Sequence, residues 1–139
     1  MPVRFDPETD YPLGSLRPDL VRTPSGLSLE DVTLASARDG TLDATDVRAT
    51  AETLRLQADV ARAAGRAQLA DGIERAAELT RMRDDELLAV YTALRPGRSS
   101  AAELAAWADR LEEIGALRSA AFVREAAAVY AERGLLVRG

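Results

Sequence analysis

Hydrophobic residues recur with helical spacing over the C-terminal two-thirds of the chain. One stripe joins Leu54, Ala58 and Ala61 at intervals of four and three residues, which places their side chains on one face of a helix. The pattern resumes beyond Gly65 and continues to about Thr80. A glycine inside a helix costs roughly 1 kcal/mol relative to alanine. We therefore favour a long helix that is either bent at Gly65 or broken there into two.

Two further helices are predicted on either side of a Pro-Gly turn. The first spans about 84–94, with aspartates at its start that complement the helix dipole, and Pro96 ends it. The second begins with a capping box between Ser100 and Glu103. Its apolar residues recur at intervals of three, four and three, a narrow seam suited to helix packing: Leu104, Trp107, Leu111 and Ile114.

The last predicted helix spans about 117–133, with Gly134 as its stop, and is apolar on nearly every side. The pattern leaves open whether Gly115, just ahead of it, kinks or breaks the helical run. A helix of this composition is buried on more than one side, and we expect one side to face another protein. Arg124 lies in an otherwise apolar line of this helix, so we expect a partner to supply its acceptor.

The first part of the chain lacks this periodicity and carries five of the six prolines. We expect an irregular arm over 1–49, followed by a helical bundle over 50–139. The arm should contain short helical turns, one of them over Thr33–Gly40, between a threonine N-cap and a glycine stop. Apolar anchors such as Tyr11 and Leu13 suit an arm that wraps over its own chain or over a partner, and the pattern does not distinguish the two.

The predicted fold class is therefore all-α, an open up-and-down helical bundle with an irregular N-terminal arm. Its length of 139 residues suits one modest core, and aromatic residues make up only 4% of it. The chain has no cysteine and no histidine, which excludes thiolate chemistry, disulfides, zinc fingers and Ser-His-Asp triads. Its aromatic residues Tyr91, Trp107 and Tyr130 have the spacing of core residues rather than of a ligand-stacking site.

Carboxylates remain as candidate catalytic or metal-binding groups. The densest acidic group, on the predicted helix that begins at Ser100, has the spacing of a solvent-facing charged surface near Arg110: Glu103, Asp109, Glu112 and Glu113. We therefore predict no catalytic, cofactor-binding or metal-binding residue in this chain.

The charge pattern also limits the partners. All 18 basic residues are arginines, dispersed among acids, and the net charge is −5, which opposes binding to nucleic acid. No apolar run has the length of a membrane span, and the N-terminus lacks the apolar stretch of a signal peptide. We expect a cytoplasmic protein with no membrane contact. Arg95 and Arg98 flank the Pro-Gly turn, where they either offset the dipole at a helix end or contact a partner.

Six stretches of the chain, in their order and spacing, resemble the small, or gamma, subunit of adenosylcobalamin-dependent diol and glycerol dehydratases. The resemblance covers nearly the whole chain from Asp10, and the stretches are DYPLG at 10–14, TLDATDVRAT at 41–50, ETLRLQADVARAAGR at 52–66, ERAAELT at 74–80, VYTALRPGRSSAAEL at 90–104 and AAFVREAAAVYAER at 120–133.

The resemblance implies a complex of large (alpha), medium (beta) and small subunits, paired into a dimer of heterotrimers. It implies a barrel-shaped large subunit that holds the substrate, and adenosylcobalamin between the large and medium subunits. It implies radical dehydration of a 1,2-diol, such as propanediol or glycerol, to an aldehyde. The small subunit of that family carries no catalytic group, and its fold is an open helical bundle with an irregular N-terminal portion.

Two departures from the family affect these expectations. Only the first nine residues precede the DYPLG stretch, so association with a bacterial microcompartment is not indicated. The stretch EEIGALRS at 112–119 also differs from the family's usual wording. The alternative to a dehydratase subunit is a free-standing helical adaptor or regulatory protein. For either function, the hypothetical partner interface comprises Tyr11, Leu13, Arg95, Arg98, Phe122 and Arg124.

Overall fold

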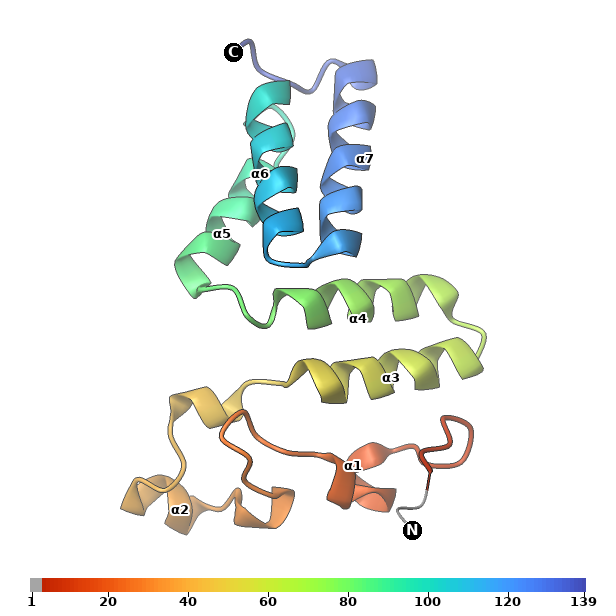
Figure 1. Ribbon diagram of the computed structural model, residues 1–139, viewed down its shortest axis with the longest axis vertical. Coiled ribbons are helices and arrows are strands. Elements are labelled where there is room, and N and C mark those ends of the chain that lie inside the picture. Colours follow the sequence, from red (N-terminus) through yellow and green to blue (C-terminus); the bar gives the residue numbers. More distant parts are fainter. Residues whose placement is uncertain (1–3) are drawn as a thin grey trace. The chain divides into compact units, whose positions relative to one another are not determined.

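The computed structural model describes residues 4–139 and consists of helices joined by turns (Figure 1). The only β-type pairing among these residues is an isolated bridge between Arg22 and Ser28. The chain divides into two compact units, the first ending at Thr80 and the second covering Arg81–Gly139. The predicted all-α class is confirmed, and neighbouring helices pair as hairpins within each unit. The division into an arm over 1–49 and a bundle over 50–139 stays a prediction.

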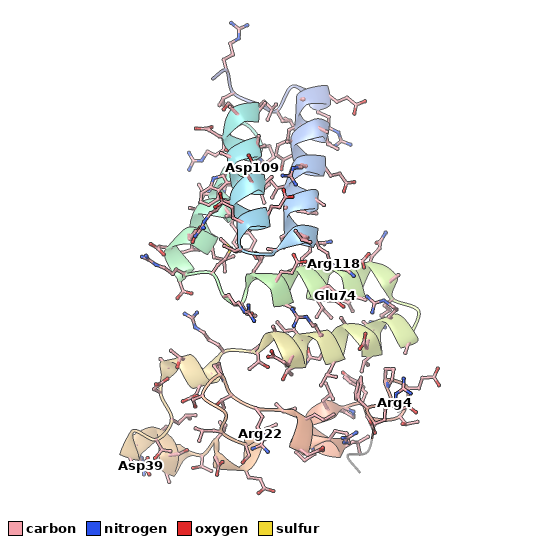
Figure 2. The ribbon with its side chains drawn as sticks, in the orientation of Figure 1. Arg4, Arg22, Asp39, Glu74, Asp109 and Arg118 are labelled. Atoms are coloured by element: carbon pink, nitrogen blue, oxygen red, sulfur yellow. The ribbon has the colours of Figure 1, made fainter. Side chains whose placement is uncertain are left out.

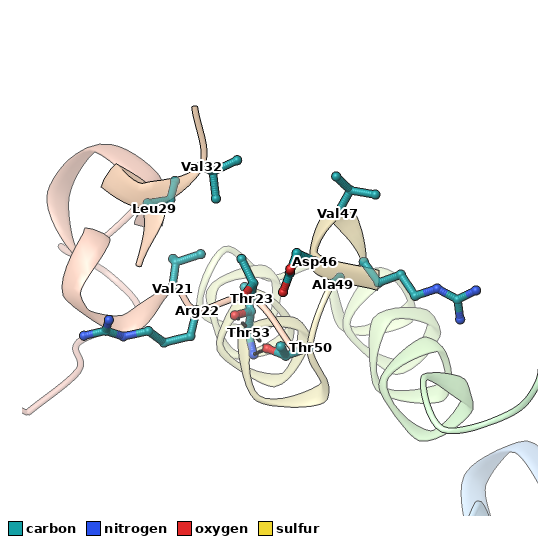
Figure 3. A pocket seen from close by; sticks show the side chains of 11 residues that line it. Val21, Arg22, Thr23, Leu29, Val32, Asp46, Val47, Ala49, Thr50 and Thr53 are labelled. Carbon is teal, nitrogen blue, oxygen red and sulfur yellow. Dashed lines mark hydrogen bonds between the residues drawn. The ribbon is translucent and has the colours of Figure 1, made fainter. Parts of the chain in front are cut away.

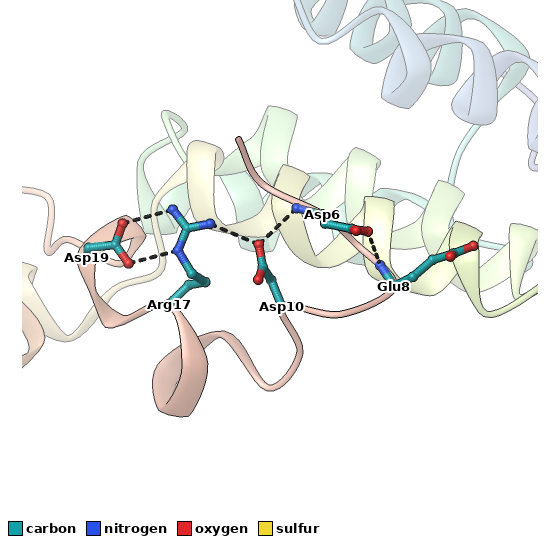
Figure 4. Close-up of polar contacts among 5 residues, drawn as sticks. All are labelled: Asp6, Glu8, Asp10, Arg17 and Asp19. Carbon is teal, nitrogen blue, oxygen red and sulfur yellow. Dashed lines mark hydrogen bonds and ion pairs between the residues drawn. The ribbon is translucent and has the colours of Figure 1, made fainter. Parts of the chain in front are cut away.

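The first unit begins with short helical elements. They are α1 at Leu13–Leu16, 3-10 turns at Pro18–Leu20, Leu29–Asp31 and Ala44–Val47, and α2 at Leu34–Asp39. The predicted turn over Thr33–Gly40 is confirmed, because the Thr33 hydroxyl accepts a hydrogen bond from the Ser36 amide and Gly40 adopts a φ of 84°. An arginine fork adds to the local order: Arg17 pairs with Asp10 and Asp19, each at 2.9 Å (Figure 4).

A buried carboxylate ties two stretches of this irregular region together. The Asp46 side chain accepts hydrogen bonds from the Ser25 hydroxyl, from the Ser25 amide at 3.3 Å and from the Asp43 amide at 3.1 Å. Asp46 lines a groove of about 410 Å³, and Figure 3 shows it close to Thr23. These donors, the Ser25 hydroxyl first, lower the pKa of Asp46 from 3.8 to about 2, because they stabilise its charged form.

The rest of the first unit is a helical hairpin of α3 at Ala51–Ala63 and α4 at Ala67–Leu79. Gly65 adopts a φ of 78°, a left-handed conformation that ends α3 and reverses the chain. The question of a kink or a break is therefore settled in favour of a break. The buried contact between the two helices is made of small residues, Ala58, Ala61 and Ala70, with Ile73 packed against them.

The second unit contains α5 at Asp84–Ala93, α6 at Ala101–Glu113 and α7 at Leu117–Arg133. Gly115 has a φ of 82° and interrupts the helical run between α6 and α7. These two helices pack against each other as a second hairpin. The predicted capping box is confirmed: the Ser100 amide donates to Glu103 at 2.8 Å, and the Glu103 amide donates to the Ser100 hydroxyl at 3.2 Å. The largest fully buried side chains are Leu104, Leu111 and Val123.

Candidate partner interface

The acidic residues of α6 act as partners for arginines of the same unit. Glu86 on α5 accepts from Arg110 at 2.7 Å, and Arg110 also lies 3.6 Å from Glu113. Arg110 and Glu113 are exposed and Glu86 is half-buried, and the Arg110–Glu86 pair links α6 to α5 near the surface. The acidic residues of α6 therefore make surface ion pairs, and Glu103 caps the helix. This is the charged surface that their spacing predicts.

Arg124 on α7 finds its acceptors on α6. Its guanidinium lies 2.6 Å from a Glu112 oxygen and 3.0 Å from an Asp109 oxygen; Figure 2 shows Asp109 on α6. These hydrogen bonds, Glu112's first, raise the pKa of Arg124. The expectation that Arg124 needs a partner's carboxylate therefore rested on a wrong premise. The carboxylates come from residues 12 and 15 positions earlier in the same chain, across the hairpin.

The C-terminal end of α5 is closed by residues other than the two arginines of the turn. The Ser99 hydroxyl donates to the Ala93 carbonyl oxygen at 2.8 Å, and the Tyr130 hydroxyl donates to the Leu94 carbonyl oxygen at 2.5 Å. These two bonds satisfy carbonyls that the end of a helix leaves without backbone partners. Arg95 and Arg98 remain exposed, with no ion pair or side-chain hydrogen bond to any residue in 4–139.

The segment that follows α7 returns to this same turn. The Gly97 amide donates to the Leu135 carbonyl oxygen at 2.7 Å, and the Val137 amide donates to the Ser99 carbonyl oxygen at 3.0 Å. Gly97 adopts a φ of 74°, a conformation that side-chain-bearing residues rarely adopt. The backbone of the C-terminal segment is therefore fixed against the Pro-Gly turn.

α5 exposes two large apolar side chains on one face. Leu88 is 66% exposed and Tyr91 is 57% exposed, and their spacing continues one turn later to Arg95. The expectation that Tyr91 belongs to the core is therefore wrong. Beside this stripe, a groove of about 470 Å³ runs between α5 and α6; it is lined by half-buried Trp107 and by Arg98, among others.

Comparison with known proteins identifies the chain's relatives. The family model described as dehydratase small subunit matches residues 7–137, nearly the whole chain and both of its units. The chain belongs to the dehydratase small-subunit family. It is 52% identical over 126 residues to the propanediol dehydratase small subunit of Citrobacter freundii, and 51% identical over 126 residues to that of Salmonella typhimurium. Each alignment covers 90% of this chain and 73% of the relative.

In this dehydratase small subunit, the two predicted interface residues of the arm have different environments. Tyr11 is 62% exposed and lines a second groove of about 470 Å³ with Val60 of α3 and Leu69 of α4. Leu13 is only 4% exposed, so its side chain already packs inside the first unit. The arm thus belongs to the same compact unit as α3 and α4, and Tyr11 is the residue of the pair that a partner can reach without rearrangement.

The remaining predicted interface residues lie in the second unit. α7 buries one side, with Ser119, Ala120 and Val123, and it exposes Leu117 and Phe122. The expectation that α7 is covered on more than one side is not met within this chain. Leu117 and Phe122, on different sides of α7, are therefore left open to solvent.

Sequence reasoning missed two features of this surface. The hydrogen bonds by which Ser99 and Tyr130 cap the end of α5 join residues 6 and 36 positions apart in the sequence. No local sequence motif predicts them. The exposure of Leu88 and Tyr91 had a signal, because their stripe runs directly into Arg95; a stripe that leads to a charge is a poor candidate for a core.

Two further observations concern the described residues 4–139. They contain no group of three or more acidic, histidine or cysteine side chains arranged to hold a metal ion. Within the same range, no helix combines the length and the apolar character required to cross a membrane.

Proposed function

We propose that this chain is the non-catalytic small subunit of a diol dehydratase, an enzyme that converts 1,2-diols such as 1,2-propanediol to aldehydes. The observation that carries the proposal is identity of 52% across 90% of the chain with a protein named as a propanediol dehydratase small subunit. The matched family region spans both compact units, so the likeness extends to the whole fold. A free-standing adaptor is disfavoured because both named relatives are dehydratase subunits.

The proposed enzyme contains large and medium partner subunits, assembled as a dimer of heterotrimers in the bacterial cytoplasm, with adenosylcobalamin as its cofactor. The cofactor would supply the radical chemistry of the dehydration. The chain has no histidine or cysteine side chain that could ligate the cobalt of the cofactor. We assign the cofactor and the substrate, whether propanediol or glycerol, to the partner subunits, as the family resemblance implies.

The proposed contribution of this chain is structural: it binds a partner subunit and stabilises the assembled enzyme by mass action. Exposed side chains supply the candidate contacts, namely Tyr11, Arg95, Arg98 and Phe122. Leu13 supports the interface from inside the first unit, where it is buried beneath the arm's surface. Arg124 is the weakest of the predicted contacts, because Asp109 and Glu112 already occupy its guanidinium.

The test is reconstitution of the enzyme from separately tagged large, medium and small subunits. We expect this chain to co-purify with the other two and to be required for stable turnover of 1,2-propanediol in the presence of adenosylcobalamin. The purified chain alone should show neither turnover nor stoichiometric binding of adenosylcobalamin by calorimetry. Full activity of the other two subunits without this chain, together with failure to co-purify, would refute the proposed function.

A further inference from the structure

The arginines of the second unit fall into two groups. Members of the first group, such as Arg83, Arg110 and Arg124, have carboxylate partners in the same unit. A second group is exposed and makes no ion pair or side-chain hydrogen bond to any of residues 4–139. Four members of the second group lie in the Pro-Gly turn or at the C-terminal end of the chain, and we call them the basic corner: Arg95, Arg98, Arg133 and Arg138.

The fold brings the two segments that carry the basic corner together. The bonds from Gly97 to Leu135 and from Val137 to Ser99, at 2.7 and 3.0 Å, pair the turn with the C-terminal segment. The Tyr130 hydroxyl, bound to the Leu94 carbonyl oxygen, joins the end of α7 to the end of α5. Four arginines are thereby carried by two paired segments of a chain whose net charge is −5.

Few carboxylates lie beside these arginines in the sequence. Glu103 is engaged in the capping box with Ser100, and Glu132 is exposed on the last turn of α7. The ends of α5 and α7 carry partial negative charge, which favours nearby cations but leaves guanidinium donors free to bind elsewhere. A guanidinium presents five N–H donors in a planar fork that matches a carboxylate. The basic corner is therefore suited to an acidic surface.

The apolar stripe of α5 continues this charged surface. Leu88 and Tyr91 are exposed on one face of α5, and Arg95 follows Tyr91 by four residues, just beyond the end of the helix. An apolar centre bordered by arginines is the usual composition of a protein interface, in which tyrosine and arginine are enriched. A phosphate polymer would match the arginines but would leave Leu88 and Tyr91 uncovered.

We infer that the basic corner and the Leu88–Tyr91 stripe form one docking surface for a partner subunit that presents carboxylates against the arginines and an apolar patch against the stripe. The inference rests on the proposed function, which supplies the existence of a partner subunit. It adds four residues that sequence reasoning did not select, Leu88, Tyr91, Arg133 and Arg138, and it specifies the partner's charge.

The absence of lysine from the chain makes a direct test possible. Single variants Arg95→Lys, Arg98→Lys and Arg138→Lys each introduce the chain's only side-chain amine, which a carbodiimide joins to a carboxylate within contact distance. In the assembled enzyme we expect peptides cross-linked from these positions to aspartate or glutamate of a partner subunit. The matched control is Arg81→Lys, an exposed arginine of the same unit outside the basic corner, which should give no such peptide.

Charge reversal measures the effect on assembly. The Arg95→Glu/Arg98→Glu double variant should associate with its partner at least about tenfold more slowly at low salt, and the difference should shrink as salt is raised. Arg81→Glu should associate at the wild-type rate. Loss of assembly in Leu88→Ser/Tyr91→Ser, with the helical circular dichroism spectrum unchanged, would support the apolar part of the surface.

The outcomes separate this inference from the proposed function. Failure of the unaltered chain to co-purify with the dehydratase subunits refutes the proposed function. Normal assembly of the unaltered chain, with no cross-link from the basic corner and no effect of the double charge reversal, refutes only the docking surface. Retention on a polyphosphate column that is lost in the double variant, with assembly unaffected, would instead assign the basic corner to phosphate polymers and overturn the inference.

Discussion

The two helical hairpins of this chain are built on the same turn but on different cores. In the α3–α4 hairpin, the Gly65 amide donates to the Arg62 carbonyl oxygen at 3.0 Å, and the next amide donates to Ala61 at 2.9 Å. In the α6–α7 hairpin the corresponding bonds, from Gly115 and the residue after it, are also 3.0 and 2.9 Å. The glycine φ angles, 78° and 82°, are likewise alike.

The buried contacts of the two hairpins differ. α3 and α4 bury alanines, which bring backbones close but remove little apolar area per residue from water. α6 and α7 bury Leu104, Leu111 and Val123. The same local motif therefore leads to a hairpin held by close backbone packing in one unit and to one held by larger interlocking side chains in the other. The predictions below test that difference, from the largest expected effect to the smallest.

Leu104→Ala should give the largest loss of stability. Leu104, in the first turn of α6, is 1% exposed, and truncating a buried leucine removes transfer free energy and leaves a cavity. Such substitutions cost about 2–5 kcal/mol. Chemical denaturation of the intact chain should show a lower midpoint, whereas truncation of the exposed Leu88 should leave it nearly unchanged. A loss as small as that of Leu88→Ala would show that the α6–α7 core is not what holds the second unit.

Ala58→Leu should destabilise the α3–α4 hairpin by overpacking its contact, the opposite of the cavity that Leu104→Ala creates. Ala58 is fully buried in a cluster with Ala61 and Ala70, so a larger side chain would have to displace its neighbours. Overpacking of this kind costs about 1–3 kcal/mol. Ala63→Leu, at a position on the same helix that is exposed, is the matched control and should be close to neutral. Equal stability of both variants would indicate that the hairpin tolerates separation and that small residues there are not required.

The two hairpins also show what the sequence alone can and cannot determine. Local signals located the helices, the Ser100 capping box and the glycine stops, because each depends on residues within a few positions of one another. The choice between kink and break at Gly65 depends on whether α4 packs back on α3, which is a tertiary contact. The acceptors of Arg124 were missed for the same reason: Asp109 and Glu112 lie on another helix, and only the hairpin brings them within reach.

Gly65→Ala and Gly115→Ala should destabilise the chain by similar amounts. No atom outside the immediate chain neighbours lies within 4 Å of the position a Cβ would take in either case, so the cost comes from the left-handed backbone alone. That cost is roughly 1–2 kcal/mol per residue. Equal losses in denaturation would confirm that the turns are equivalent. Clearly different losses in the free energy of unfolding would show that one hairpin adjusts its turn to accommodate the alanine. We would expect this adjustment, and the smaller loss, in the α3–α4 hairpin, which buries smaller side chains.

The stability of the first unit should fall at acidic pH, because Asp46 becomes protonated. Its pKa is about 2 in the folded chain and 3.8 ordinarily, so the charged form is favoured by folding. The stabilisation is fully present above about pH 4 and is lost as pH falls through about 2. The difference in melting temperature between the unaltered chain and Asp46→Asn should therefore shrink over this window. A difference that stays constant down to pH 2 would show that the carboxylate charge does not carry the effect.

Arg124→Ala and Arg62→Ala should give the smallest changes. The Arg124 contacts with Asp109 and Glu112 cross the α6–α7 hairpin at 3.0 and 2.6 Å, yet all three side chains are about half exposed or more, and exposed ion pairs contribute little. The corresponding contact of the other hairpin, Arg62 with Glu74, is longer at 3.7 Å, so Arg62→Ala should change still less. Both variants should assemble normally with partner subunits, because their guanidinium groups already have carboxylate partners within the chain. Loss of assembly in Arg124→Ala, with the melting temperature unchanged, would show that Arg124 contacts a partner subunit. The docking surface would then lie on α7 rather than on α5 and the basic corner.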